Sequence, residues 1–348
     1  MSRLRVAVIG AGSWGRNHVR TIASLQEAEL AAVCDVDAQR RAQVARQFPA
    51  AKVTADADAA MAAADAVIVA TPAVDHPGLA TAAIERGLPV LVEKPFALTS
   101  AEARRVAELA DRKGVPVVAG HLLLFHPAVV RVREMLDAGD LGQIFYLYSQ
   151  RVNLGQVRPD ENALWSFGPH DVSVARFLLG ARPAAVAARG HSYLQPGIED
   201  VVFLTLEFGS GALAHVQMSW LDPHKERRLT VVGSKRMVVF DDMQPREKLK
   251  VFDKGVDRPP EYRSYGESLS IREGDIFIPR IPNAEPLTAE LRHFVAVARG
   301  EEQSRVTAWD GVEVVEILEV ASESLRSDGR AIALGPEDPH RPVVGSAG

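Results

Sequence analysis

Short apolar runs alternate with longer amphipathic segments over the first third of the chain. The pattern predicts strands at residues 4–9, 30–35, 66–70, 89–92 and 115–119, and helices at 15–25, 38–48, 77–85 and 100–113. Strands that alternate with helices of this length predict a parallel, doubly wound sheet. The strands are apolar throughout, which agrees, because such a sheet is covered on both faces.

The pattern changes in the rest of the chain. Strands follow one another with short turns and no helix between them, at residues 184–192, 201–208, 212–220, 227–232 and 237–240. Such successive strands pair antiparallel, so a second architecture is expected here. An earlier strand at 144–151 and helices at 131–136, 170–179, 287–299 and 311–325 complete it, and residues 253–283, rich in Pro, Gly and charge, are expected to form a long excursion.

Composition narrows the class of protein. With 47% hydrophobic and 24% charged residues and a net charge of −5, the chain is typical of a soluble globular protein with no nucleic-acid or membrane partner. No apolar run approaches the roughly 20 residues of a membrane span, and the first residues do not form a signal peptide. The only cysteine, Cys34, excludes an internal disulfide and suits the cytoplasm. No cluster of ligands has the spacing of a metal site.

A glycine-rich turn follows the first strand. Gly10-x-Gly12-x-x-Gly15 opens a helix, and Asp35 ends the next strand about 20 residues further on, which completes a dinucleotide fingerprint. The glycines let the backbone approach the pyrophosphate, and the helix N-terminus supplies N–H donors to it. Ser13 and Trp14 lie inside the turn; Trp14 either lies beside the cofactor or plugs the turn.

Asp35 favours NAD over NADP as the cofactor. Its carboxylate would accept hydrogen bonds from the adenosine ribose hydroxyls and would repel a 2′-phosphate. No Arg follows directly, but Arg40 and Arg41 lie close enough in the sequence to keep NADP open.

Other strand ends carry polar or turn residues, and ligands of open parallel sheets bind beyond those ends. They are Thr71-Pro72, Glu93-Lys94-Pro95 and Gly120-His121. A cation such as Lys94 beside a nicotinamide would hydrogen-bond and polarise the reacting oxygen of an alcohol. Glu93 would neutralise or orient Lys94, and a cis peptide at Pro95 would direct Lys94 inward.

Three stretches, AVIGAGSWGRNH, DAVIVATPAVDHPGLATAAIERGLPVLVEKPFALT and VVAGHLLLFHPAV, together resemble the glucose–fructose oxidoreductase/inositol dehydrogenase (Gfo/Idh/MocA) family. The resemblance runs from residue 4 to about residue 330. It implies a Rossmann domain, here residues 1–122, and an α/β domain with a large, mostly antiparallel sheet, here residues 123–335. The last residues, 336–348, are expected to form a loose tail. Family members usually oxidise a sugar or cyclitol hydroxyl, or reduce the matching ketone, with a nicotinamide cofactor. They commonly pack these sheets face to face as dimers or tetramers.

The resemblance also implies a second catalytic residue. His170 fits the family histidine that exchanges a proton with the substrate hydroxyl, a role that imidazole suits near neutral pH. Ser166 replaces the usual aspartate of that pattern, so the partner of His170 is Asp171, another acid, or none. The alternative for His170 is a helix-start residue after Pro169.

Further polar residues have two readings each. His76 packs near the nicotinamide or caps the next helix, and His126 faces the pocket or caps a helix. Contacts with the sugar are expected from Arg151, Asn153, Trp165 and His121. The alternative for Arg151 and Asn153 is a polar strand edge, and the alternative for Trp165 is an indole packed in the core. A basic group follows Trp220 and consists of His224, Lys225, Arg227 and Arg228. It either binds a phosphate of a nucleotide sugar or forms a solvated turn.

These features predict an NAD-dependent oxidoreductase that acts on a sugar, free or nucleotide-linked, with Lys94 and His170 as its catalytic residues. Two alternatives remain at this point. One is a sensor or partner subunit that binds dinucleotide and sugar without turnover, and the other is a glycosidase that uses tightly bound NAD.

Overall fold

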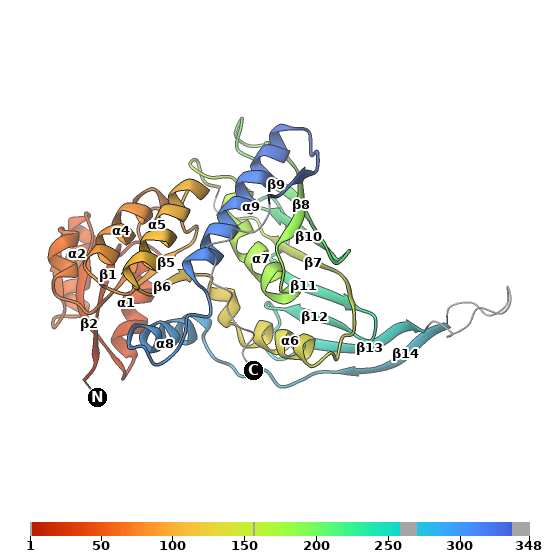
Figure 1. Cartoon of the computed structure of the whole chain (residues 1–348), viewed down its shortest axis with the longest axis horizontal. Helices are drawn as coiled ribbons and strands as arrows, with labels where there is room; N and C mark the ends of the chain where they lie inside the picture. Colours follow the sequence, from red (N-terminus) through yellow and green to blue (C-terminus); the bar gives the residue numbers. More distant parts are fainter. Residues whose placement is uncertain (1, 156, 258–269, 336–348) are drawn as a thin grey trace. The chain divides into compact units, whose positions relative to one another are not determined.

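The computed structural model describes residues 2–155, 157–257 and 270–335, and the chain forms two compact units (Figure 1). The first unit comprises residues 1–125 and 284–316, and the second comprises residues 126–283 and 317–348. The expected boundary after residue 122 stays a prediction; the structure adds that residues 284–316 return to the first unit. The expected loose tail, residues 336–348, lies outside the described residues.

The first unit is built on a parallel sheet, as predicted. Within the described residues it has six strands in the order β3-β2-β1-β4-β5-β6. They are β1 (Leu4–Ile9), β2 (Ala28–Cys34), β3 (Lys52–Thr54), β4 (Ala66–Val69), β5 (Val90–Glu93) and β6 (Val117–Gly120). The strand order reverses between β1 and β4, and such a reversal opens a ligand crevice beyond the carboxyl ends of the strands.

Helices connect these strands. They are α1 (Gly15–Ser24), α2 (Ala38–Gln47), α3 (Ala57–Met61), α4 (His76–Glu85) and α5 (Ser100–Lys113), with 3₁₀ turns η1 (Ala73–Asp75) and η2 (Leu122–Phe125). The alanine-rich stretch at residues 55–66 was expected to be helical, and α3 lies within it. The sequence pattern missed β3, because three residues are too few to show a period.

A helix from late in the sequence completes the core of the first unit. Helix α8 (Pro286–Ala298) lies beside the early elements in Figure 1, and it packs against α1 and η2. Leu291 and Phe294 of α8 are fully buried in the same apolar cluster as Val8 and Ile22. Burial of each such side chain stabilises the fold by about 1.5–3 kcal/mol.

The second unit contains a large, mostly antiparallel sheet. In the described part of the chain its nine strands follow the order β14-β13-β12-β11-β7-β10-β9-β8-β15, and only β7 and β10 pair parallel. The strands are β7 (Ile144–Val152), β8 (Pro183–His191), β9 (Val201–Phe208), β10 (Leu213–Ser219), β11 (Glu226–Gly233), β12 (Met237–Asp241), β13 (Leu249–Asp257), β14 (Ser270–Phe277) and β15 (Ile332–Ala333). The predicted fold class is therefore confirmed.

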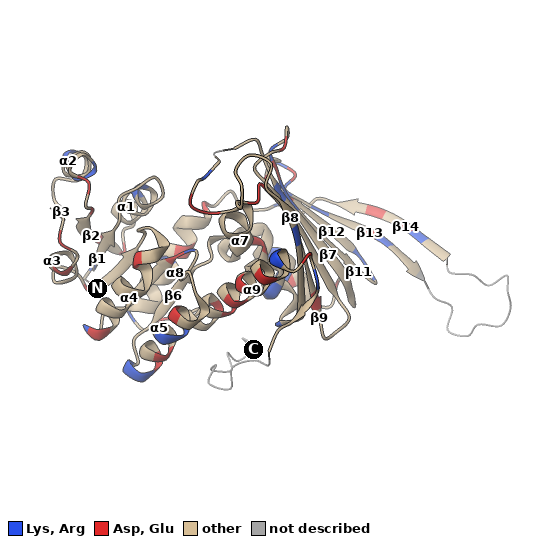
Figure 2. Cartoon of the chain, turned by 90° about the horizontal axis from the view of Figure 1, so that it is seen from above, with Lys and Arg blue, Asp and Glu red and all other residues tan. Residues whose placement is uncertain are grey.

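The expected excursion at residues 253–283 is partly regular. Strands β13 and β14 pair with each other and extend past the neighbouring strands (Figures 1 and 2), while residues 258–269 between them lie outside the described part. Pro and Gly in this region suggested a loop, but cross-strand pairing to β12 overrides that local preference.

Helices cover one face of this sheet. They are α6 (Pro127–Asp137), α7 (Ala163–Leu179) and the second half of α9 (Ala308–Arg326), and no helix among the described residues covers the other face (Figures 1 and 2). Tyr146, Tyr148, Phe203 and Leu213 on that open face are 38–45% exposed.

Helix α7 begins earlier than predicted. The expected start at His170 was wrong, because Pro169 was read as a helix boundary, whereas it lies inside the helix. Asn162 provides the N-cap, since its side-chain oxygen accepts the N–H of Trp165 at 3.0 Å. His170 therefore lies in the middle of α7.

Candidate active site

Two glycines of the turn, Gly10 and Gly15, leave no room for a side chain. A Cβ on Gly10, whose φ is +95°, would lie 2.5 Å from the carbonyl oxygen of Ala70, and a Cβ on Gly15 would lie 2.0 Å from the carbonyl oxygen of Gly10. The first turn of α1 has no acidic residue, and its N-cap Trp14 makes no side-chain cap. Backbone N–H groups at this helix end are therefore suited to an anion, and Ser13 lies exposed beside them.

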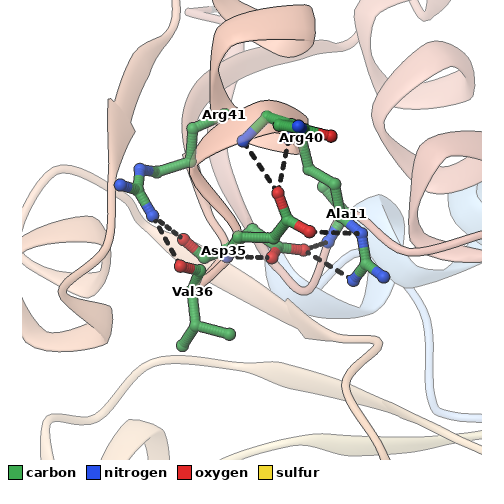
Figure 3. Close-up of polar contacts among 7 residues, drawn as sticks. Ala11, Asp35, Val36, Arg40 and Arg41 are labelled. Carbon is green, nitrogen blue, oxygen red and sulfur yellow. Dashed lines mark hydrogen bonds and ion pairs between the residues drawn. The ribbon is translucent and has the colours of Figure 1, made fainter.

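Asp35 lies where a ribose acceptor belongs, at the carboxyl end of β2 and next to the glycine turn (Figure 3). Its Oδ2 accepts the N–H of Ala11 at 2.7 Å, and its Oδ1 accepts the N–H of Asp37 at 2.8 Å. These bonds fix the carboxylate, which is buried. It still has lone pairs for two further donors, as expected for a group that binds ribose hydroxyls.

The two arginines after Asp35 have different partners. Arg40 Nη1 lies 3.6 Å from Asp35 Oδ2, and its side chain is half exposed. Arg41 donates to the carbonyl oxygens of Asp35 and Val36, at 2.8 and 2.9 Å (Figure 3). Arg41 is thus engaged by backbone.

The turn, the helix end and the carboxylate together fit NAD. The glycines let the backbone of the turn approach a pyrophosphate closely, and Asp35 offers acceptors to a ribose. The turn, the helix end and Asp35 all belong to the first unit and lie within one stretch of the chain, residues 10–35.

Residues after β4 are held to the segment after β5. His76 Nε2 lies 2.9 Å from the carbonyl oxygen of Thr71, and its Nδ1 lies 2.9 Å from that of Pro95. Burial lowers the pKa of His76, although both carbonyl contacts oppose this shift. His76 therefore fixes the Thr71-Pro72 turn against the segment that carries Lys94.

Glu93, the last residue of β5, is the centre of a buried hydrogen-bond network. Its Oε1 accepts the indole N–H of Trp14 at 2.5 Å and lies 2.7 Å from His18 Nε2, and its Oε2 accepts the backbone N–H of Lys94 at 3.0 Å. Burial alone would raise the pKa of Glu93, but bonds and charge from His18, with those of Trp14 and Lys94, hold the pKa below its usual range.

Lys94 itself is half-buried just beyond β5, and the Lys94–Pro95 peptide bond is cis, as predicted. Trp14 is 39% exposed and bonded to Glu93, so it is neither a fully buried plug nor a free surface group.

In the second unit an ion pair joins β7 to α7. Arg151 Nε donates to Asp171 Oδ2 at 2.5 Å, and Ser149 Oγ donates to Asp171 Oδ1 at 2.6 Å. All three side chains are buried. Asp171 is therefore hydrogen-bonded by Arg151 and Ser149, two residues other than its neighbour His170. The charge of Arg151 is balanced by Asp171.

The remaining predicted sugar contacts lie at the start of α7 and the end of β7. Trp165 Nε1 donates to Ser322 Oγ of α9 at 3.0 Å, while Ser166 is buried one residue further along α7. Asn153 Oδ1 is buried and makes no hydrogen bond to any described residue. The side-chain oxygen of Asn153 could therefore accept a hydrogen bond from a ligand.

His121 and His126 follow β6. His121 is buried. His126 is the N-cap of α6, because its Nδ1 accepts the N–H of Ala128 at 3.1 Å, and its Nε2 lies 3.4 Å from Asp242 Oδ1. The hydrogen bond from His126, supported by Lys248, holds the pKa of Asp242 well below its usual range against the effect of burial.

The basic group after Trp220 divides into solvated and half-buried members. His224 and Lys225 are exposed, whereas Arg227 is half-buried and pairs in register with Arg151 on β7. Burial lowers the pKa of Arg227, and the charge of Arg151 adds to this, while Asp171 and Asp242 oppose it. Arg227 therefore lies half-buried beside a second cation, Arg151, and within the influence of two carboxylates.

Sequence reasoning missed His18, a partner of Glu93 in the first unit, and Asp242, a partner of His126 in the second unit. His18 lies four residues after Trp14, which places both on one face of a helix start, and that spacing was an available signal. Asp242 follows β12 with no motif around it, so only the fold brings it to His126.

Residues 2–155, 157–257 and 270–335 contain no group of three or more His, Cys, Asp or Glu placed to hold a metal ion. Across the same described segments, no helix is both long and apolar enough to cross a lipid bilayer.

Comparisons with known proteins agree with this architecture. Residues 4–121 match the profile of the oxidoreductase family with an NAD-binding Rossmann fold, and residues 129–239 match the GFO/IDH/MocA C-terminal domain. Inositol 2-dehydrogenase 2 of Saccharopolyspora erythraea is 30% identical over 345 residues, which cover 96% of this chain and 97% of that protein.

Two further relatives show the range of the similarity. UDP-N-acetylglucosamine 3-dehydrogenase of Acidithiobacillus ferrooxidans is 29% identical over 266 residues, covering 75% of this chain and 80% of that protein. The structure of GenD2 from gentamicin A biosynthesis, solved in complex with NAD, has a TM-score of 0.80 and 27% identity, with 97% of each chain covered. The chain belongs to the Gfo/Idh/MocA family of oxidoreductases, and its first unit is the family's NAD-binding Rossmann domain.

Proposed function

We propose that the chain is an NAD-dependent dehydrogenase or reductase that acts on a hydroxyl or keto group of a sugar. The observation that carries this is the position of Lys94. It directly follows β5 at the carboxyl edge of the parallel sheet, the same edge that carries the glycine turn and Asp35. Relatives named for inositol and for a nucleotide sugar support a polyol substrate.

Lys94 hydrogen-bonds the reacting oxygen and stabilises its alkoxide character. Bound NAD supplies the hydride acceptor, or as NADH the hydride donor. Glu93 holds the backbone N–H of Lys94, and His76 holds the carbonyl of Pro95, so the segment on both sides of the ammonium is anchored. Thr71, Pro72 and Trp14 line the approach to the cofactor.

His170 takes the hydroxyl proton during oxidation and returns it during reduction. The role requires Lys94 and His170 to reach one substrate oxygen. Asp171 is bound by Arg151 and Ser149, so it does not replace the missing family aspartate, and Ser166 stands in that position. We assign Asn153, Trp165, Arg151, His121 and His126 to the surroundings of the substrate.

Among sugars, we propose one that carries an anionic group, such as a nucleotide-linked sugar. Arg227 and Arg151 are cross-strand neighbours. Asp171 already binds Arg151, and Asp242 already binds Lys248 at 2.8 Å. One guanidinium charge is left over in a half-buried setting, and a phosphate or carboxylate of the substrate would balance it.

We further propose a cytoplasmic homo-oligomer that packs through the open sheet face. Its supports are the single cysteine and the aromatic and aliphatic side chains exposed on β7, β9 and β10. Tyr146 and Leu213 are register partners on that face. Patches of this kind usually mark an interface.

The test is NADH fluorescence with purified protein and its Lys94→Ala variant, screened against free and nucleotide-linked sugars. We expect Lys94→Ala to lower turnover by about 10²–10⁴-fold. Its NAD affinity should stay within about tenfold, or ~1.4 kcal/mol. Unchanged turnover in the variant would remove Lys94 from the mechanism.

The same screen separates the alternatives. Binding of sugar and NAD without any NADH signal, in the wild type and with every sugar, would favour a sensor. Release of sugar from a glycoside with NAD that copurifies, and no need for added cofactor, would favour the glycosidase.

A further inference from the structure

Helix α8 carries a carboxyl group into the core of the first unit. Glu290 is 0% exposed, and neither of its side-chain oxygens makes a hydrogen bond to any described residue. It lies on the same helix as the core residues Leu291 and Phe294. An ionised carboxylate in such a place is very costly, so the group is expected to be neutral.

The charge of a second buried carboxylate, that of Glu93, sharpens this expectation. Burial, and then the negative charge of Glu93, hold the pKa of Glu290 well above its usual range. Glu93 is stabilised as an anion by His18, Trp14 and the N–H of Lys94, whereas Glu290 has no such donors. The pair therefore holds one negative charge and one proton, with the charge on Glu93.

The titratable groups on α1 and η2 are few. On α1, His18 points its Nε2 at Glu93, its buried Nδ1 makes no hydrogen bond to any described residue, and Arg20 pairs with Glu285 at the surface. Helix η2 has no ionisable residue, although the buried His121 precedes it.

The ionisable neighbours of Glu290 on its own helix are turned to other partners. Arg292 on α8 pairs with Glu27, and His293 pairs with Glu302.

We propose that Glu290 is a positioning residue: as a neutral acid it leaves Glu93 the sole anion of the buried pair, so that Glu93 can hold the segment that presents Lys94. The proposal rests on the proposed role of Lys94 in the reaction. Loss of the Glu290 proton would add a second negative charge to the core formed by α8, α1 and β5, and its repulsion would disturb the bonds from Trp14, His18 and Lys94 to Glu93. A buried acid without partners costs stability at neutral pH, and such costs are usually kept at functional sites.

The first test compares the stability of wild type and Glu290→Gln as a function of pH. The unfolded chain loses the Glu proton near pH 4.3, but the folded chain keeps it to higher pH. Wild type therefore loses stability, relative to the variant, from about pH 4 upward, until Glu290 ionises in the folded state. We expect the Tm of Glu290→Gln minus that of wild type to rise over this range. A flat difference would overturn the proposal.

The second test detects the proton itself. Infrared spectra near neutral pH should show the carbonyl stretch of a protonated, buried carboxylic acid in wild type, and this band should be missing in Glu290→Gln. Glu301→Gln, a substitution at an exposed position just after α8, serves as the matched control and should keep the band. The same band in wild type and Glu290→Gln, or its absence from wild type, would overturn the proposal.

The third test asks whether the proton serves the reaction. Wild type should lose kcat/KM at alkaline pH as Glu290 ionises, and Glu290→Gln should lack that loss, while Glu301→Gln should follow wild type. An alkaline loss that is the same in Glu290→Gln and wild type would show a buried acid without a positioning role.

The stability and infrared tests need no turnover, so their outcome is independent of the Lys94→Ala result. If Lys94→Ala retains full activity, the proposed function fails, yet these two tests still decide where the proton lies.

Discussion

Two acids, Asp171 in the second unit and Glu93 in the first, are buried but held in different ways. In the second unit, Asp171 receives two bonds from Arg151 and one from Ser149, so a full positive charge balances its own. In the first unit, Glu93 relies on an indole, an imidazole and a backbone N–H, and Glu290 has no hydrogen-bond partner among the described residues.

This difference distinguishes an acid with a structural role, Asp171, from an acid beside the proposed catalytic residue, Glu93. A paired charge joins a strand to a helix, and its geometry is fixed by the pair itself. A carboxylate held by an imidazole, an indole and a backbone N–H, without an arginine or lysine among these partners, is more open to the influence of its surroundings, which is useful next to a catalytic lysine. The expectation that Arg151 contacts the sugar therefore competes with a structural role visible in its bonds to Asp171.

The largest expected effect is on the paired acid. Asp171→Asn leaves the Arg151 guanidinium buried without its anion, and removal of one partner of a buried pair costs about 3–5 kcal/mol. Urea unfolding of the variant measures this loss. A loss as small as that of a surface pair would contradict the structural role of Asp171.

The matched control is Asp65→Asn in the exposed pair Arg5–Asp65. Its Nη2–Oδ1 distance is 2.6 Å, but both side chains are 40–51% exposed. Water already solvates these charges, so the control should lose far less stability than Asp171→Asn.

A smaller effect, on ligand affinity, is expected from the first unit. Asp35→Ala removes the acceptor beside the glycine turn and should weaken NAD binding by about tenfold, or ~1.4 kcal/mol. NADP affinity should fall less, because the substitution also removes a charge that repels the 2′-phosphate. Fluorescence titrations with both reduced dinucleotides measure the gap, and equal NAD affinity in variant and wild type would refute the role of Asp35.

The sequence predicted the first unit well because its signals are local. The glycine turn, Asp35 and Lys94 each adjoin a strand end, and parallel strands bring their carboxyl ends to one edge. Period and turn chemistry therefore placed these residues without any long-range information.

Long-range pairings could not be predicted in this way. Glu290 looks like an ordinary polar position on an amphipathic helix, and only the return of α8 to the first unit buries it near Glu93. The pairing of Asp171 with Arg151 likewise needs β7 and α7 to pack, and the start of α7 was misplaced by Pro169.

The central claim is that Lys94 and His170 act on the same substrate oxygen. A double-mutant cycle in kcat/KM with Lys94→Ala, His170→Ala and the double variant tests it most directly, because residues that act as a unit show strongly non-additive losses. We expect the double variant to be about as slow as the slower single variant. Losses that multiply would show that the two residues act independently and would contradict the account.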